Sequence, residues 1–222
     1  MDRIGLETGL SWWITCAESP HFARCATRCS MIPKEGAVVA DVTLSAQNAL
    51  PQGDVIERAG TAIRVLPMQQ MTSMMPGAGA DALATVLMDE HGLALPGVGQ
   101  TSTSAGGRCL WFGHRQYLLI GVSPAHSLSD VAALTDQSDG WSTVLLEGPL
   151  ARDVLARLCP LDLRAAHFAQ GAVARTEIRH MMACVTRVSE DGFRLMVFRS
   201  MAETLLDELR HGLLSCAARE NL

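Results

Sequence analysis

Apolar positions along the chain recur with two spacings, and these spacings predict which segments are helices and which are strands. Spacings of three and four residues are typical of a helix with one buried face. They predict helices at residues 80–90, 128–134, 150–158 and 201–213. Short apolar runs between turn residues are typical of strands. They predict strands at residues 61–66, 109–112, 117–122, 141–146, 172–178, 181–188 and 193–198.

The last helix has the clearest predicted start. Ser200 and Glu203 stand three residues apart, as in a capping box, in which a hydroxyl and a carboxylate each accept a hydrogen bond from a backbone N–H of the first turn. We therefore expect the helix to begin at Ser200, with Met201, Leu205 and Leu209 along one face.

The predicted elements follow the order β-α-β-β-α-β and then α-β-β-β-α. Interleaved helices and hairpins with few long crossovers indicate an α+β fold, in two intertwined lobes of mixed or antiparallel sheet with helices. The first six elements match a ferredoxin-like split β-α-β unit. We expect one domain at residues 36–222, with lobes at roughly 58–147 and 148–218.

Residues 1–35 form an N-terminal extension that follows neither spacing. It is either an upstream part of the reading frame, with Met31 as the native start, or an arm that contacts a partner. It holds Cys16, His21, Cys25 and Cys29, which are residue types that bind zinc. Only the two later cysteines have the compact spacing of a structural site, so an incidental cysteine-rich segment is favoured over a metal site.

Composition narrows the function classes. Hydrophobic residues make up 48% and charged residues 18% of the chain, a balance typical of ordered globular proteins. The net charge of −5 argues against a nucleic-acid partner, because phosphate contacts need a basic surface. No apolar run approaches the roughly 20 residues that cross a bilayer. Seven cysteines, an odd number, favour free thiols in a reducing compartment. We therefore expect a cytoplasmic protein without membrane contact.

The 11 methionines fit a subunit that buries uneven surface against partners, because the flexible thioether fills irregular gaps. Compositional drift is an equal alternative.

No set of residues has the pattern of a catalytic or cofactor site. Gly97 and Gly99 lie in a glycine-rich loop, but the loop lacks the preceding strand, the third glycine and the Gly-Lys-Ser/Thr ending of phosphate-binding motifs. Cys109 and Cys159 lie in or beside apolar segments, where thiols are inert packing groups. We therefore expect no catalytic, cofactor-binding or metal-binding residue in this chain.

Several segments, in order, resemble the gamma subunit of heterotetrameric sarcosine oxidase. They include Leu-Trp-Phe-Gly-His-Arg-Gln-Tyr-Leu-Leu at residues 110–119 and Leu-Cys-Pro-Leu-Asp-Leu at residues 158–163. The others are residues 95–97, 136–141, 146–149, 168–176 and 192–200. The likeness covers residues 58–215, and its specificity lies in the order and spacing of the segments. The candidates for structural or interface roles are Trp111, Trp141, Arg199, Ser200 and Glu203.

The resemblance implies a fold like the folate-binding domain of glycine-cleavage aminomethyltransferases. It implies a subunit that contributes packing and no catalytic residues. Its partners would be alpha and beta subunits, which carry FAD, FMN, NAD and the tetrahydrofolate site, and a delta subunit, which carries zinc. Such a complex oxidatively demethylates sarcosine to glycine, with formaldehyde or methylene-tetrahydrofolate as the second product.

Three alternatives stay open. Related complexes act on other N-methyl amino acids, as N-methylglutamate dehydrogenase does. A stand-alone folate-dependent aminomethyltransferase would share the fold, but it should supply an acidic residue for the pterin and is usually longer. A non-enzymatic scaffold protein is the third alternative.

Overall fold

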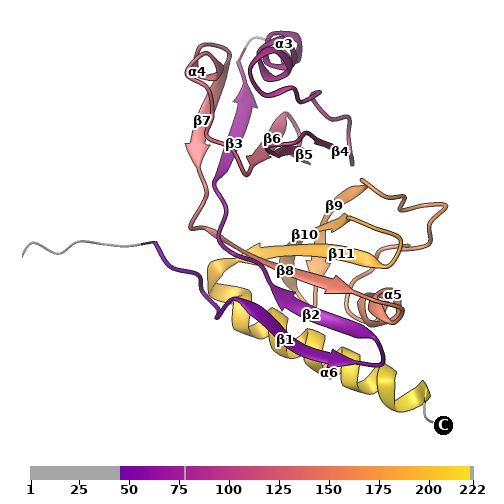
Figure 1. Ribbon diagram of the computed structural model, residues 1–222. Coiled ribbons are helices and arrows are strands. Elements are labelled where there is room, and N and C mark those ends of the chain that lie inside the picture. Colours follow the sequence, from indigo (N-terminus) through magenta and orange to yellow (C-terminus); the bar gives the residue numbers. More distant parts are fainter. Residues whose placement is uncertain (1–45, 78, 221–222) are drawn as a thin grey trace, which may run out of the picture. The chain divides into compact units, whose positions relative to one another are not determined.

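The computed structural model describes residues 46–77 and 79–220, so the N-terminal extension and its candidate zinc ligands lie outside the described residues. Runs of two or three strands, each followed by a helix, make up this part of the chain (Figure 1). The strands are β1 (Gly53–Arg58), β2 (Thr61–Val65), β3 (Met71–Pro76), β4 (Thr101–Thr103), β5 (Arg108–Gly113), β6 (Gln116–Ile120), β7 (Ala132–Asp136), β8 (Trp141–Glu147), β9 (Val173–Ile178), β10 (Met181–Arg187) and β11 (Gly192–Phe198). The helices are α3 (Ala80–His91), α4 (Leu128–Val131), α5 (Ala151–Leu155), the 3-10 helix η1 (Arg199–Met201) and α6 (Ala202–Glu220).

The fold contains two antiparallel sheets, which agrees with the predicted α+β class. One has six strands in the order β1-β2-β8-β11-β10-β9, and the other has five in the order β4-β5-β6-β3-β7. The chain leaves the six-stranded sheet after β2, forms the five-stranded sheet, and returns at β8. The sheets are therefore intertwined in sequence, and the expected lobe boundary at residues 147 and 148 does not separate them.

The five-stranded sheet contains the predicted ferredoxin-like unit, but with different outer strands. Its strands β5, β6, β3 and β7 are neighbours in that order, and the helices α3 and α4 follow β3 and β6 in sequence. This is the β-α-β-β-α-β arrangement. The segments that we expected at its two ends, residues 61–66 and 141–146, instead form β2 and β8, which pair with each other in the six-stranded sheet.

Three hydrophobic clusters follow from the alternation of side chains along the strands. One lies between the six-stranded sheet and the helices α5 and α6, and includes Ile63, Leu195 and Leu209. A second lies between the five-stranded sheet and the helices α3 and α4, and includes Leu83 and Leu119.

The third cluster draws on both sheets, with Leu110 and Leu118 from the five-stranded sheet and Cys184 and Met196 from the six-stranded sheet. The two sheets thus pack against each other through the faces that their helices leave uncovered, and Figure 1 shows α6 on the opposite side of the six-stranded sheet. Among the described residues, no helix is long and apolar enough to cross a membrane.

The predicted capping box at the start of the last helix is wrong, because the structure begins that helix differently. The turn begins one residue earlier, with Arg199–Met201 as the 3-10 helix η1, and Phe198 is its N-cap without a side-chain hydrogen bond. Ser200 therefore lies inside the first turn, where its hydroxyl cannot accept a bond from the N–H groups that a cap residue reaches. The buried face is as predicted at Leu205 and Leu209, whereas Met201 is 42% exposed.

The strands β1, β3, β4 and β7 were not predicted, because their sequences lack an apolar alternation. The strand β7 lies at an edge of its sheet, and most of its side chains are exposed or half-buried. Its Leu134 also stands at helical spacing from Leu128 and Val131, which explains the predicted helix over residues 128–134. In the structure that helix ends at Val131 and the chain continues as a strand.

Candidate functional site

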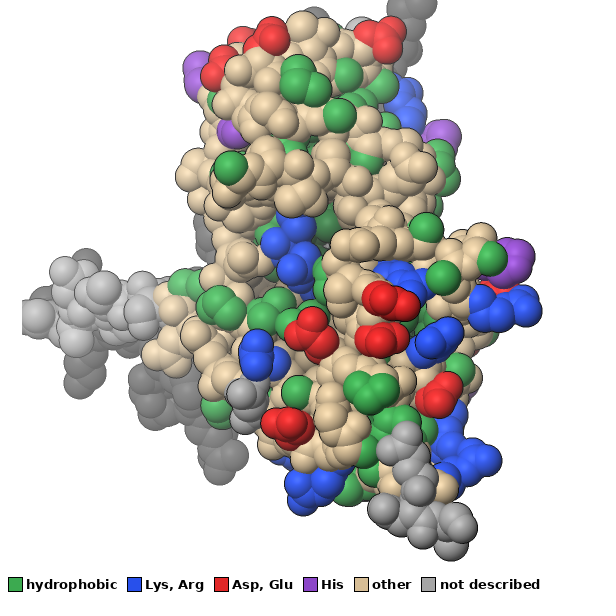
Figure 2. Space-filling model, turned by 45° about the vertical axis from the view of Figure 1, so that its right-hand side comes forward, with side chains coloured by type: hydrophobic (Ala, Val, Ile, Leu, Met, Phe, Trp, Pro, Cys, Tyr) green, Lys and Arg blue, Asp and Glu red, His purple; other side chains and the backbone are tan. Residues whose placement is uncertain are grey.

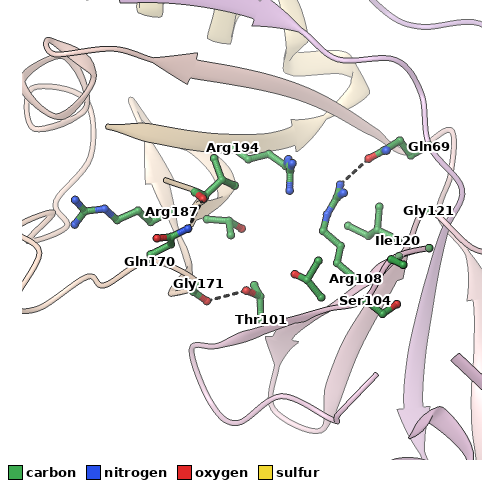
Figure 3. A pocket seen from close by; sticks show the side chains of 16 residues that line it. Gln69, Thr101, Ser104, Arg108, Ile120, Gly121, Gln170, Gly171, Arg187 and Arg194 are labelled. Carbon is green, nitrogen blue, oxygen red and sulfur yellow. Dashed lines mark hydrogen bonds between the residues drawn. The ribbon is translucent and has the colours of Figure 1, made fainter. Parts of the chain in front are cut away.

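A polar cavity of about 480 Å³ lies between the two sheets (Figure 3). On one side it is lined by β4, by the start of β5 and by the loop that joins them, and on the other by residues 170–171 and by parts of β10 and β11. Its volume is in the range of small-molecule sites in proteins. Figure 2 shows basic side chains set into the middle of the surface drawn.

Two arginines enter this cavity because of strand alternation. On β11, Phe193, Leu195 and Val197 pack toward the helices, so Arg194 shares the other face with Met196. On β5, Arg108 shares a face with Leu110, which belongs to the cluster between the sheets. The cavity is thus the polar continuation of the apolar contact between the sheets.

The two guanidinium groups have few partners within the protein. Arg108 donates a hydrogen bond to the side-chain oxygen of Gln69 at 2.6 Å, but its Nε atom is buried and has no partner. The Nε atom of Arg194 is likewise buried without a partner among the described residues. Burial and, to a smaller degree, the charge of Arg194 lower the pKa of Arg108 to about 10, and burial also lowers the pKa of Arg194. Both groups are therefore charged at neutral pH but poorly solvated.

A third arginine of the lining, Arg187, has a different environment. Its guanidinium donates hydrogen bonds to the backbone carbonyls of Phe168, Ser189 and Glu190, and it lies over the ring of Phe193. Each of its three nitrogen atoms thus donates to a backbone carbonyl, and these contacts fix the loops at this end of β10. Arg187 is thus a structural residue, and Arg108 and Arg194 are the ones with unused donors.

Backbone contacts hold the cavity walls together. The N–H and the hydroxyl of Thr101 both donate to the carbonyl of Gly171 at 2.9 Å, and the N–H of Val173 donates to the carbonyl of Gly99 at 2.9 Å. These bonds connect β4 and the preceding loop to the start of β9. The separation of the two walls is therefore set by backbone hydrogen bonds, which stiffens the cavity.

Trp141, one of the five residues singled out from the sequence, is the centre of an aromatic cluster. It is 6% exposed, meets the ring of Phe112 edge-on at 5.3 Å, and stacks on Phe198 at 4.5 Å. The guanidinium of Arg175 lies 4.1 Å from the centre of the Phe112 ring. Such contacts stabilise a fold beyond the area that they bury. Trp141 therefore packs one sheet against the other in the core between them.

The other four residues lie apart from the cavity. Trp111 is half-buried on β5, while Arg199, Ser200 and Glu203 are exposed at the start of α6. Arg199 donates a hydrogen bond to the backbone carbonyl of Gln47. Arg199 and Ser200 border an open hollow of about 700 Å³. Phe198, which is 45% exposed, borders it too.

The described cysteines are buried. Burial raises the pKa of the Cys109 thiol to about 12, so this thiol stays protonated and unreactive at neutral pH. Cys159 is also buried and its pKa is raised. Within the described residues, no three metal-ligating side chains come together.

Comparison with known proteins shows which folds this geometry resembles. Residues 114–212, slightly under half of the chain, match the family model of the GCVT N-terminal domain. A chain in the solved structure of heterotetrameric sarcosine oxidase from Corynebacterium sp. U-96, in complex with pyrrole 2-carboxylate, is similar with a TM-score of 0.65 and 21% identity. The chain has a GCVT-type fold. The match covers 74% of this chain and 89% of that one. No curated protein matches the chain in sequence.

These findings confirm the resemblance and the fold class that the sequence indicated. The sequence did not single out the two cavity arginines. A signal for one of them existed, because Arg194 interrupts the otherwise apolar run of residues 193–198, and a charge within such a run marks either an exposed face or a polar cavity. For Arg108, which stands at the start of its strand, no such signal existed.

Proposed function

We propose that this chain is the gamma-type, non-redox subunit of a cytoplasmic sarcosine-oxidase-like complex. The observation that carries the proposal is the fold match, which spans 89% of a chain from a heterotetrameric sarcosine oxidase. The shares of 74% and 89% also mean that the matched chain is shorter than this one. The similarity is therefore to a small chain of that assembly and extends over most of its length.

In this proposal the chain completes the assembly, and its alpha, beta and delta partners carry the chemistry. The complex would oxidatively demethylate sarcosine, or a related N-methyl amino acid, with FAD, FMN, NAD, tetrahydrofolate and zinc in the other subunits. The electrostatics of the cavity support this division of roles. Basic side chains, not carboxylates, line it among the described residues, whereas a pterin site should supply an acidic residue.

The surface that we assign to a partner lies at the end of β11 and along η1, directly before the start of α6. The side chains of Phe198 and Met201 are 45% and 42% exposed. The ring of Phe198 also stacks on the buried ring of Trp141. An exposed aromatic next to an apolar side chain and an arginine has the composition of an interface core. The open hollow beside them can receive a protruding side chain.

Co-expression with candidate alpha, beta and delta subunits from the same host tests the proposal. A tagged chain should retain flavin-containing subunits through size-exclusion chromatography, while the chain alone should show no stoichiometric flavin or nicotinamide absorbance and no bound zinc. Recovery of the tagged chain as a stable monomer, with none of the co-expressed subunits, would contradict the subunit role.

Two variants test the assigned surface. Met201→Glu should weaken retention of the partners at least tenfold, because it places a charge in an interface core. Met88→Glu changes a methionine of similar exposure, 49%, on α3, and should leave retention unchanged. Equal effects of both variants would show that partners do not bind at the assigned surface. Folate-dependent transfer of a one-carbon unit by the chain alone would favour the aminomethyltransferase alternative.

A further inference from the structure

The cavity between the sheets holds an excess of positive charge that nothing in its lining balances. Three arginines line it, and no aspartate or glutamate is among the described residues of its wall. Arg187 uses its donors on backbone carbonyls. Arg108 has one side-chain partner, and the guanidinium of Arg194 has no hydrogen bond or ion pair among the described residues, with its Nε atom buried.

An arrangement of this kind costs free energy in the unliganded protein. Buried cations are normally paired, because the free energy lost when a charge leaves water is not offset without an opposite charge nearby. Here two guanidinium groups line one cavity, and in Figure 3 the group of Arg194 extends into the space beside that of Arg108, which is directed to Gln69. The effect is visible in the pKa of Arg108, which burial and the neighbouring charge both lower. A single anion between the two groups would remove both costs.

We propose that this cavity binds a small oxyanion, a carboxylate or a phosphate, between the side chains of Arg108 and Arg194. The planar guanidinium presents parallel N–H donors that match the oxygens of these groups, and the buried Nε donors of both residues are unused. The side chains of Thr103 and Thr186 line the same cavity, and their hydroxyls can donate further hydrogen bonds. The volume of about 480 Å³ admits a metabolite larger than the anionic group alone.

The wall that carries Arg108 leaves room for such a ligand. The loop over residues 104–107 contains Gly106 and Gly107, and Gly107 lies so close to Val122 that a Cβ atom there would sit 3.0 Å from that side chain. Both glycines line the cavity and have no side chain that would fill it. This site is additional to the proposed role as a subunit and does not depend on it.

Isothermal titration calorimetry on the full chain, alone or with its partners, tests the proposal. Inorganic phosphate and succinate are titrated at constant ionic strength, with chloride as the reference anion. We expect saturable one-to-one binding of at least one of the two probes. Which of them binds more tightly distinguishes a phosphate ligand from a carboxylate ligand. If neither probe binds at millimolar concentration, or if chloride binds equally well, the proposal fails.

Matched variants locate the binding. Arg194→Gln should weaken the anion about ten- to a hundredfold, the loss expected for one charge-assisted hydrogen-bonding group, and should unfold no earlier than the wild type without ligand, because an unpaired buried charge is removed. Arg210→Gln removes an arginine that pairs with Asp207 on the surface of α6 and should leave binding unchanged.

Arg108→Gln serves as the second cavity variant if Arg194→Gln does not fold. Equal affinity of the wild type and either folded cavity variant would overturn the assignment.

Discussion

Replacement of Gly148 by alanine tests how the six-stranded sheet connects to α5. Gly148 follows β8 with φ +130°, a conformation that is nearly restricted to glycine. A Cβ atom at this position would lie 2.6 Å from the Cα atom of Thr61 and would also meet the carbonyl of Gly60. Both are backbone atoms at the turn into β2, so a side chain cannot simply rotate away.

The expected loss of stability follows from these two effects. A non-glycine residue in such a backbone conformation costs about 1–3 kcal/mol, and overpacking against rigid atoms costs about 1–3 kcal/mol more. The lower entropy of the unfolded alanine variant returns about 0.4–1 kcal/mol. Gly148→Ala should therefore destabilise the protein by about 1–5.5 kcal/mol, or roughly 2–22 °C in Tm for a domain of this size.

Gly53→Ala is the matched control. Gly53 has φ +110°, but nothing lies within 4 Å of its Cβ position, so only the conformational cost of about 1–2 kcal/mol applies. Urea unfolding followed by tryptophan fluorescence measures both variants. If Gly148→Ala loses no more free energy of unfolding than Gly53→Ala, the close approach of β8 to the β1–β2 turn is refuted.

Three further outcomes are expected. Ser200→Ala should change the free energy of unfolding by less than about 0.5 kcal/mol, because the Ser200 hydroxyl does not cap the helix. Leu209 is fully buried in α6, so Leu209→Ala should lower the free energy of unfolding by about 2–5 kcal/mol. Similar losses for both variants in urea unfolding would contradict a helix that begins before Ser200. Burial raises the pKa of Cys184 to about 12, so iodoacetamide at pH 8 should modify this thiol only after unfolding, as peptide mass spectrometry would show. Hydrogen bonds from Arg164 hold the pKa of the Asp162 carboxyl well below its usual value. A carboxyl whose pKa is lowered by folding stabilises the folded state at pH values above its usual pKa. This stabilisation is lost as the pH falls through the lowered pKa. Asp162→Asn should therefore flatten the acid side of the stability profile slightly, and 1 M salt should reduce the difference because the pair is exposed.

The sequence by itself determined the elements whose residues carry a local period. The helix over residues 80–91 shows this, because its apolar positions and the glycine after it specify both its face and its end. The hairpin of β5 and β6 and the strands β10 and β11 were likewise visible as apolar runs. The order of these elements was sufficient to indicate the α+β class, and the ordered segments were sufficient to indicate the resemblance that the comparisons support.

Only the tertiary structure decided how the strands combine. Pairing of β2 with β8 joins residues about 80 positions apart, and no local pattern encodes a contact at that distance. The same holds for β3, whose Thr72 and Ser73 are buried because neighbours cover them. At the last helix, Phe198 and not Ser200 is the N-cap, and it is also the last residue of β11.

The two cavity arginines depend most on the tertiary structure. Arg108 and Arg194 are 86 residues apart in sequence, and each is an ordinary polar residue of its own strand. They face one cavity because the two sheets pack through the faces that their helices leave free. Strand alternation fixes which face a side chain takes, but only the packing of one sheet on the other decides what that side chain meets.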